Sequence, residues 1–352
     1  MPALFLHCRP GFEGECAAEI QERAAVLGIA GYCRARPDTA FAIFEYYAED
    51  QRLIDRLRLD DLIFTRQWFE VLAAYDDLPA HDRITPIITA LTGSPAAGGT
   101  LLLETPDTNE AKELQRLCRK LQPPLESALK KRGLLTRTGG LQLHVAFLGS
   151  THAVAGYAPA GNASPWPMGI PRLRFPREAP SRSTLKLEEA LLHFLGPAER
   201  ERLLAPGMTA VDLGAAPGGW TWQLVRRHLK VIAVDNGPMD AALMDSGLVE
   251  HRREDGFRFR PERPVDWVVC DMVEKPARVA ALMADWLAGG MARQALFNLK
   301  LPMKKRYPEL KACLARVEGE LASLGPGYRL ACRQLYHDRE EVTVFARPGP
   351  GA

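Results

Sequence analysis

A glycine-rich turn between a predicted strand and a predicted helix carries the residues best suited to chemistry. Residues 209–222 read TAVDLGAAPGGWTW, in which 210–213 favour a buried strand and 218–225 favour a helix. A strand, a tight turn and a helix in this order let backbone N–H groups approach a bound ligand closely. The segment therefore predicts a ligand site formed by Asp212, Gly214, Ala216, Pro217, Gly218 and Gly219.

The spacing within this turn distinguishes two classes of cofactor. Dinucleotide-binding turns read G-x-G-x-x-G and place a pyrophosphate at the helix N-terminus. Here the pattern is D-x-G-x-A-x-G, with an acidic residue on the strand and a proline in the turn. S-adenosylmethionine carries an ammonium that needs an acceptor and a carboxylate that needs donors, so the pattern favours this cofactor over NAD. An ordinary tight turn without a ligand is the alternative.

Three further acidic residues and one lysine follow predicted strands in the second half of the chain. Strands expected over 230–235, 248–252, 265–270 and 294–299 end at or near Asp235, Asp255, Asp271 and Lys300. Ligands of open α/β sheets bind outside the carboxyl ends of the strands, so we expect these side chains beside the glycine turn. Asp235 has the spacing of a carboxylate that accepts from ribose hydroxyls, which NAD proteins share. Asp255 could accept a hydrogen bond from the exocyclic amine of adenine. The alternative is that it only stabilises a turn.

The composition limits the class of protein. With 352 residues the chain is long enough for two or three domains. A net charge of +2 gives the protein no strong overall positive potential that would attract nucleic acid. A nucleic-acid partner must therefore be argued from local basic patches. The seven cysteines lack a C-x-x-C pair and the eight histidines lack paired ligand spacing, so we expect reduced thiols and no metal. Without a long apolar run or a signal-like start, we expect a soluble, cytoplasmic protein that has no membrane partner.

The first half of the chain predicts two small α+β units, over 1–60 and 61–160. The first has the order strand, helix, strand, strand, helix over 3–8, 13–27, 31–36, 40–47 and 51–58. The second has expected strands over 62–72, 100–104, 141–149 and 151–158, and helices near 82–92 and 109–120. Pro123-Pro124 is expected to end the latter helix before another begins. Basic residues on these helices are typical either of solvated surface or of phosphate contacts to RNA.

A proline-rich segment separates the two halves. Residues 159–183 contain six prolines and four arginines, and 161–180 are expected to form a semi-rigid linker. A plain spacer needs no arginines around Trp166 and Phe175, so the segment favours RNA contact through Arg172, Arg174, Arg177 and Arg182.

The second half, 181–352, predicts an α/β domain. A helix capped by Ser183 or Thr184 is expected to run to about Leu195. Strands and helices then alternate, with helices over 275–289 and 307–324. A final hairpin over 328–336 and 341–347 brings Glu341 to the sheet.

Six motifs in order give this half a specific family resemblance. SRSTLKLEEA, VDLGAAPGGW, VDNGP, CDMVEKP, FNLKLPMKKRY and QLYHDREEVTV closely resemble the bacterial ribosomal RNA large subunit methyltransferase M family, and the turn resembles FtsJ-like ribose methyltransferases. The resemblance implies a ferredoxin-like unit and a THUMP RNA-binding domain in the first half. The expected fold is thus a Rossmann-like α/β sheet, parallel with an antiparallel C-terminal hairpin, preceded by two α+β units.

The resemblance also implies an activity. Members transfer a methyl group from S-adenosylmethionine to the 2′-hydroxyl of a cytidine in 23S ribosomal RNA. The implied catalytic residues are Lys186, Asp271, Lys300 and Glu341, with Lys300 as general base. We choose Glu341 over Glu340 because it directly precedes the apolar strand. The implied cofactor site comprises Ser183, Ala216, Pro217, Gly218, Gly219, Asp235, Asp255 and Asp271. Some relatives have cysteine where Ala216 stands, which matters little to a turn that acts through its backbone.

A lysine base poses a physical difficulty, because a free lysine has a pKa of ~10.4 and is protonated at neutral pH. Desolvation under RNA and the charge of Lys186 would lower the pKa of Lys300, whereas Asp271 and Glu341 would raise it. We hypothesise that the carboxylates orient both lysines and that repulsion between the lysines frees one of them.

Two other functions remain open from the sequence. One is a non-catalytic RNA-binding or ribosome-assembly protein on the same fold. The other is an NAD-dependent oxidoreductase. The absence of the G-x-G-x-x-G motif makes this function less favoured. The RNA partner could be naked 23S ribosomal RNA or a pre-ribosomal particle. Without long heptads we expect a monomer.

Overall fold

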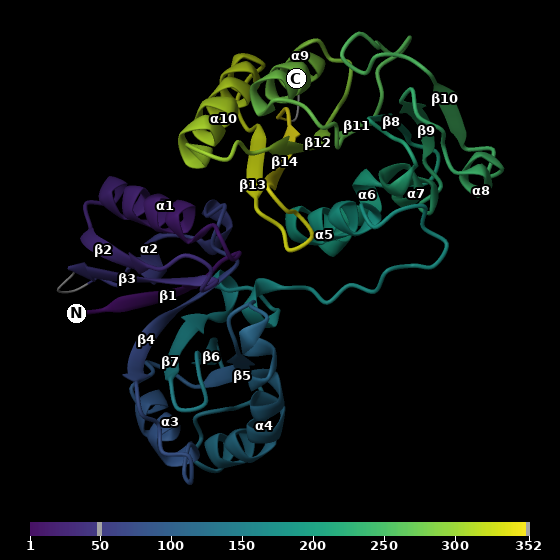
Figure 1. Ribbon diagram of the computed structural model, residues 1–352. Helices are drawn as coiled ribbons and strands as arrows, with labels where there is room; N and C mark the ends of the chain where they lie inside the picture. Colours follow the sequence, from purple (N-terminus) through teal and green to yellow (C-terminus); the bar gives the residue numbers. More distant parts are fainter. Residues whose placement is uncertain (48–50, 350–352) are drawn as a thin grey trace. The chain divides into compact units, whose positions relative to one another are not determined.

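A computed structural model describes residues 1–47 and 51–349, and the chain divides into two units (Figure 1). The first unit is Met1–Pro171 and the second is Arg172–Ala352. The division lies within the segment predicted to be a linker.

The first unit is built on one mixed sheet with the strand order β2-β3-β1-β4-β7-β6-β5. Only β5 and β6 pair in parallel, and the other neighbours in this sheet are antiparallel. Because β1 pairs with β4, the strands of the two expected N-terminal units join in a single sheet. The strands are β1 Ala3–His7, β2 Ala30–Ala35, β3 Phe41–Tyr47, β4 Gln67–Tyr75, β5 Gly98–Glu104, β6 Leu141–Phe147 and β7 Ala153–Pro159.

The helices of this unit cover the sheet with apolar faces. In α1, Cys16, Ile20 and Ala24 are fully buried, as their helical spacing predicts. The helices are α1 Glu13–Val26, α2 Leu53–Arg56, α3 Ile84–Leu91 and α4 Leu114–Lys131, with short 3-10 turns at Leu59–Asp61, Glu110–Lys112, Ala160–Asn162 and Pro167–Gly169.

The expected break of the basic helix at Pro123-Pro124 is wrong. Helix α4 runs through both prolines, which are exposed to solvent. A proline at position i leaves the carbonyl of residue i−4 without its N–H partner. Here those carbonyls belong to Arg119 and Lys120, which are also exposed, so water can replace the missing donors.

Two further boundaries differ from the sequence prediction for local reasons. The strand expected from residue 62 begins only at Gln67, because the backbone N–H groups of Ile63 and Phe64 donate to the buried carboxylate of Glu19 on α1. The first part of the expected linker folds onto the first unit, where Trp68 Nε1 donates to the carbonyl of Asn162 at 2.6 Å. Ile170 is buried there.

The second unit contains the predicted Rossmann-like sheet, with the order β10-β9-β8-β11-β12-β14-β13. The five strands from β10 to β12 are parallel, and the final hairpin adds β14 and β13 antiparallel. The predicted fold class is therefore confirmed. The strands are β8 Thr209–Leu213, β9 Lys230–Val234, β10 Val249–Arg252, β11 Trp267–Cys270, β12 Ala295–Lys300, β13 Arg329–Arg333 and β14 Glu341–Arg347.

Helices cover both faces of this sheet, with α5 to α7 on one side and α9 and α10 on the other (Figure 1). Leu187 and Trp220 pack with Trp267 and Phe345 in the core beneath α5 and α7. This packing fixes where the strand ends lie relative to α5. The helices are α5 Thr184–Phe194, α6 Pro197–Leu203, α7 Gly219–Val225, α8 Ala241–Met244, α9 Pro276–Ala288 and α10 Arg306–Ser323.

The expected side-chain cap of α5 is absent. Ser183 occupies the N-cap position in a helical backbone conformation and makes no capping hydrogen bond. Its hydroxyl instead lies 2.6 Å from that of Ser181.

Candidate active site

Four charged side chains from distant parts of the sequence meet at the carboxyl edge of the parallel strands. Lys186 lies on α5, Asp271 directly follows β11, Lys300 ends β12 and Glu341 begins β14. Lys186 Nζ lies 3.1 Å from Asp271 Oδ2, and Lys300 Nζ lies 2.6 Å from Asp271 Oδ1. Both ammonium groups also contact Glu341, one at each carboxylate oxygen. The structure thus brings together all four residues predicted to be catalytic.

The alternation of charge around this cluster stabilises the charged forms of Asp271 and Lys300. Burial alone would raise the pKa of Asp271, but Lys186 and Lys300 outweigh it and lower that pKa. Burial would likewise lower the pKa of Lys300, but Asp271 and Glu341 outweigh it and raise that pKa. In the free protein the amine of Lys300 therefore holds its proton, as the expected influence of Asp271 and Glu341 requires, and a lower pKa under bound RNA stays a prediction.

The predicted glycine turn lies at the same edge, between β8 and α7. Gly218 has φ 117°, in the region that favours glycine, and α7 begins one residue later. A Cβ at Gly219 would lie 2.1 Å from Ser183 Oγ and 2.4 Å from Ser181 Oγ. The missing side chain therefore lets the start of α7 touch the segment before α5, which places the predicted Ser183 beside the turn. Gly214, Ala216 and Pro217 form the rest of it, with a cis peptide between the last two.

Asp235 closes this turn from the end of β9. Its Oδ2 accepts from the backbone N–H of Ala216 at 3.1 Å, and its Oδ1 accepts from that of Gly237 at 2.7 Å. Asp255 is exposed, and its Oδ1 accepts from the backbone N–H of Phe257 at 2.9 Å. This hydrogen bond is typical of an aspartate that stabilises a turn, which is the alternative considered for Asp255. The carboxylate stays accessible to a ligand.

Asp212 is less accessible than a ligand acceptor should be. The side chain is 1% exposed, and its Oδ2 accepts from Thr221 Oγ1 at 2.6 Å. Burial raises its pKa to about 7, although the hydrogen bond from Thr221 acts in the opposite direction. The geometry favours a role in holding α7 against β8 over the predicted contact with a ligand.

One polar residue next to the cluster is missing from the sequence prediction. Asn298 is fully buried on β12, and its Nδ2 donates to Asp271 Oδ1 at 3.0 Å. It stands two residues before Lys300, on the same face of the strand. A lone amide in the apolar run ALFNLK is the signal that could have identified it.

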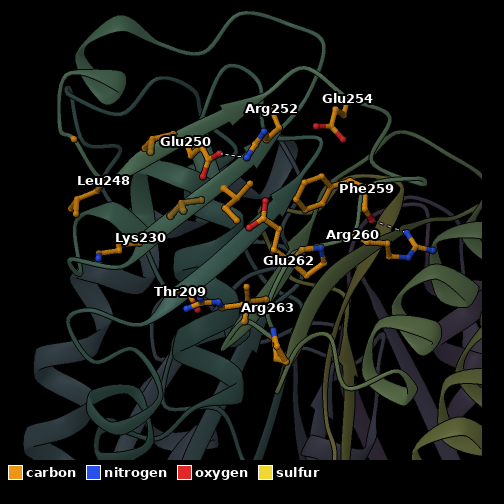
Figure 2. A pocket seen from close by; sticks show the side chains of 17 residues that line it. Thr209, Lys230, Leu248, Glu250, Arg252, Glu254, Phe259, Arg260, Glu262 and Arg263 are labelled. Carbon is orange, nitrogen blue, oxygen red and sulfur yellow. Dashed lines mark hydrogen bonds and ion pairs between the residues drawn. The ribbon is translucent and has the colours of Figure 1, made fainter.

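A separate hollow lies at the opposite edge of the second sheet. It has a volume of roughly 600 Å³ and is lined by the first residues of β8 and β9, by residues along β10 and by the loop before β11. Figure 2 shows Glu250 and Arg252 paired in it, with Arg260 and Glu262 on the loop. None of the predicted site residues lines it, because parallel strands have their amino ends here and their carboxyl ends at the charged cluster.

Comparison with known families accounts for nearly the whole chain. Residues 1–69 match the RlmM ferredoxin-like domain, 82–159 match the N-terminal domain of ribosomal RNA large subunit methyltransferase M, and 179–335 match the FtsJ-like methyltransferases. The chain is 56% identical to ribosomal RNA large subunit methyltransferase M of Stutzerimonas stutzeri, with 99% of each chain covered. The chain belongs to the ribosomal RNA large subunit methyltransferase M family. It is therefore a methyltransferase whose methyl donor is S-adenosylmethionine.

Other relatives agree with this membership. The methyltransferase M of Methylococcus capsulatus is 55% identical, with 97% of each chain covered. Among solved structures, TrmN from Thermus thermophilus aligns with 99% of this chain and 100% of its own, at 15% identity and a TM-score of 0.36. That likeness is too weak to inform function. Within residues 1–47 and 51–349, no helix is long and apolar enough to cross a membrane.

Proposed function

We propose that this methyltransferase modifies the 2′-hydroxyl of a cytidine in 23S ribosomal RNA, with Lys300 as the base. The observation that carries the proposal is the convergence of Lys186 and Lys300 on two carboxylates beside the glycine turn. Methylation at a pyrimidine carbon would need a thiolate nucleophile instead. Cys270, the cysteine next to Asp271, is fully buried, and burial raises its pKa to about 12, which disfavours a thiolate there.

The residues around the turn fit S-adenosylmethionine. Asp235 presents a carboxylate already oriented by Ala216 and Gly237, with lone pairs left for ribose hydroxyls. Asp255 offers an accessible acceptor for an adenine amine, and Ser183 lies beside Gly219. We assign binding to these residues, to Ala216–Gly219 and to Asp271. When bound, S-adenosylmethionine supplies an electrophilic methyl group on a sulfonium.

Lys300 takes the proton of the ribose hydroxyl in this proposal. A hydroxyl is a weak nucleophile, so removing its proton as the oxygen attacks accelerates transfer. In the free protein Lys300 is protonated, because Asp271 and Glu341 raise its pKa. RNA that covers the site removes water from the amine and, together with the charge of Lys186, favours its neutral form.

The remaining members of the cluster hold the base in place. Asp271 and Glu341 each contact both lysines, so the Lys300 side chain is restrained at its charged end. When Lys300 gains the hydroxyl proton, the same carboxylates stabilise the ammonium that forms. Lys186 balances their charge while Lys300 is neutral.

RNA contacts are proposed at three basic segments. Lys304 and Lys305 are exposed directly after β12 and lie close in sequence to Lys300, where they can contact phosphates near the target. Within the second unit, the arginines of 172–182 include Arg182, whose guanidinium lies over Phe175 at 5.8 Å. The first unit supplies the domain expected to bind RNA, through which larger structural features would be recognised.

Methyl transfer to 23S ribosomal RNA from a strain lacking the corresponding gene tests the function. Alkaline hydrolysis of the labelled RNA identifies the acceptor, because a methylated 2′-oxygen can no longer attack the neighbouring phosphate and the strand resists cleavage there. Lys300→Ala should abolish transfer while calorimetry shows nearly unchanged affinity for S-adenosylmethionine. Label at an alkali-sensitive position would contradict ribose methylation, and near-normal turnover of Lys300→Ala would remove Lys300 as the base. RNA binding without transfer would favour the non-catalytic alternative.

A further inference from the structure

A row of buried hydrogen bonds runs from the charged cluster into the core behind it. Asn298 and Thr343 face each other in register on β12 and β14. Asn298 Nδ2 donates to Asp271 Oδ1 at 3.0 Å, and Thr343 Oγ1 lies 2.8 Å from Asn298 Oδ1. Beyond Thr343 lies Asp338, whose Oδ1 and Oδ2 are 3.2 and 3.1 Å from Thr343 Oγ1. The row therefore connects Asp271 to a second carboxyl group.

The number of donor hydrogens available along this row favours a protonated carboxyl group at Asp338. The amide of Asn298 must direct its nitrogen toward Asp271, because its oxygen would repel that carboxylate. Asn298 Oδ1 then needs a hydrogen, and the hydroxyl of Thr343 has only one to give. If Asp338 were ionised, this hydrogen would have to satisfy both Asn298 and Asp338. A neutral Asp338 removes the conflict by donating its own proton to Thr343, most directly from Oδ1, since Oδ2 accepts from the backbone N–H of Leu335 at 2.9 Å.

The surroundings of Asp338 also favour the neutral acid. The side chain is 1% exposed, and burial raises its pKa well above the ordinary value. Of the charged groups around it, Glu341 and Glu189 raise this pKa further and Lys186 lowers it.

The neighbouring buried acid, Glu189 on α5, behaves in the opposite way. It accepts from the backbone N–H groups of Tyr336 and His337 at 2.8 and 2.9 Å and contacts the ring of His337. Burial would raise its pKa, but the contacts with His337 contribute most to lowering it. Two buried carboxyl groups that contact the segment between β13 and β14 thus have opposite preferences. Glu189 has two backbone N–H donors and the ring of His337, whereas Asp338 has one backbone donor, the N–H of Leu335.

We propose that Asp338 is a positioning residue for the methyl transfer reaction, which it serves as a neutral carboxylic acid. Its proton fixes the hydroxyl of Thr343, which fixes the amide of Asn298, which in turn holds Asp271 Oδ1 where Lys300 also binds it. The inference rests on the proposed function, because the geometry being fixed is that of the catalytic cluster.

Three variants separate this role from simple support of the fold. Asp338→Asn keeps a donor for Thr343 and an acceptor for Leu335, so it should retain most of the wild-type kcat. Asp338→Ala and Thr343→Val each break the row and should lower kcat by roughly tenfold or more, because small displacements of a catalytic group are costly. The double variant should be no slower than the slower single variant, since both act through one row. Affinity for S-adenosylmethionine should change little in all of them.

The experiment combines these kinetics with an infrared measurement that needs no RNA. At neutral pH, the difference spectrum of wild-type protein minus Asp338→Asn should contain the carbonyl band of a protonated carboxylic acid. Its absence, or an Asp338→Asn variant as slow as Asp338→Ala, would overturn the neutral acid. Additive losses in the double variant, or a folded Asp338→Ala with normal kcat, would overturn the positioning role. A wild-type protein that transfers no methyl would instead count against the proposed function and with it the positioning role, while the infrared band still decides the protonation of Asp338.

Discussion

Lys300 and Glu341 face each other in register across the antiparallel pair of β12 and β14. Directly opposed residues in such a pair have their Cβ atoms about 5 Å apart, so the two side chains reach each other without distortion. A shift of one residue would place Glu340 there instead. Glu340 actually lies at the surface, where its carboxylate pairs with Arg306 at 2.6 Å. The end of one hairpin therefore decides which of two adjacent glutamates joins the cluster.

The two glutamates provide a matched pair of variants. Glu341→Gln removes a carboxylate that contacts both lysines, so kcat should fall by roughly tenfold to a hundredfold as Lys300 loses its restraint. Glu340→Gln removes the same charge one residue earlier and should leave kcat close to the wild-type value. Steady-state methyl transfer with saturating RNA measures both. Equal losses in the two variants would contradict the assignment of Glu341.

The rate of methyl transfer should rise with pH through the alkaline range. Lys300 acts as a neutral amine, and in the free protein its raised pKa makes this form scarce at neutral pH. Bound RNA lowers this pKa, but the amine still has to lose its proton before it can act as the base. Below that pKa the neutral fraction grows about tenfold for each pH unit. Glu341→Gln removes a negative neighbour, which lowers the pKa and shifts the rising limb to lower pH. Single-turnover rates over roughly pH 6 to 10 test this sequence of shifts, and a flat profile would exclude a titrating lysine base.

The contact between Gly219 and Ser183 predicts a selective loss of cofactor binding. In Gly219→Ala the new Cβ would lie 2.1 Å from Ser183 Oγ and 3.1 Å from the backbone nitrogen of Thr184, so the Ser183 hydroxyl must leave its place beside the glycine turn and the start of α5 must shift slightly. Affinity for S-adenosylmethionine, measured by calorimetry, should fall at least about tenfold, which corresponds to a loss of about 1.4 kcal/mol. Gly319→Ala is the control, since a Cβ there meets nothing within 4 Å and α10 should gain stability. Unchanged affinity in Gly219→Ala would show that this contact does not shape the cofactor site.

The sequence was sufficient to predict the parts of the site that depend on the order of strands and helices along the chain. Apolar runs followed by Asp235, Asp271 and Lys300 predict strands whose carboxyl ends share one edge, and the structure has them there. The fold class follows from the same alternation of strands and helices. The tetrad itself needed the family resemblance, because spacing does not reveal that Lys186 on α5 reaches the same point.

Other features depend on register and burial, which the sequence does not specify. The row from Asp271 to Asp338 exists because Asn298 and Thr343 are paired across strands, a relationship set by the hairpin's exact register. Asp212 has the residue type of a ligand acceptor, but β8 is central in the sheet and buries it. Helix α4 continues through two prolines because their side of the helix happens to face water.

Asp212 should make stability depend on pH. An aspartate in an unfolded chain has a pKa of ~3.9, whereas burial raises that of Asp212 to about 7 in the folded protein. The resulting contribution to the free energy of unfolding is fully present below the unfolded pKa and is lost as pH rises toward the folded value. Asp212→Asn carries no charge at any pH and keeps an acceptor for Thr221. The Tm of this variant minus that of the wild type should therefore increase between about pH 4 and pH 7, and a constant difference would contradict a titrating Asp212.

Lys304 and Lys305 should contribute to RNA affinity and little to chemistry. Both are exposed between β12 and α10, beside the strand that ends in Lys300. If they neutralise phosphates, Lys304→Ala with Lys305→Ala should raise the KM for RNA, leave kcat nearly unchanged and reduce the slope of log affinity against log salt by between about one and two. Lys230→Ala is the matched control, because this exposed lysine begins β9 at the opposite edge of the sheet. A salt slope that falls equally in Lys230→Ala, or that does not change in the double variant, would mean that the charge beside Lys300 is solvated surface and that phosphates bind elsewhere.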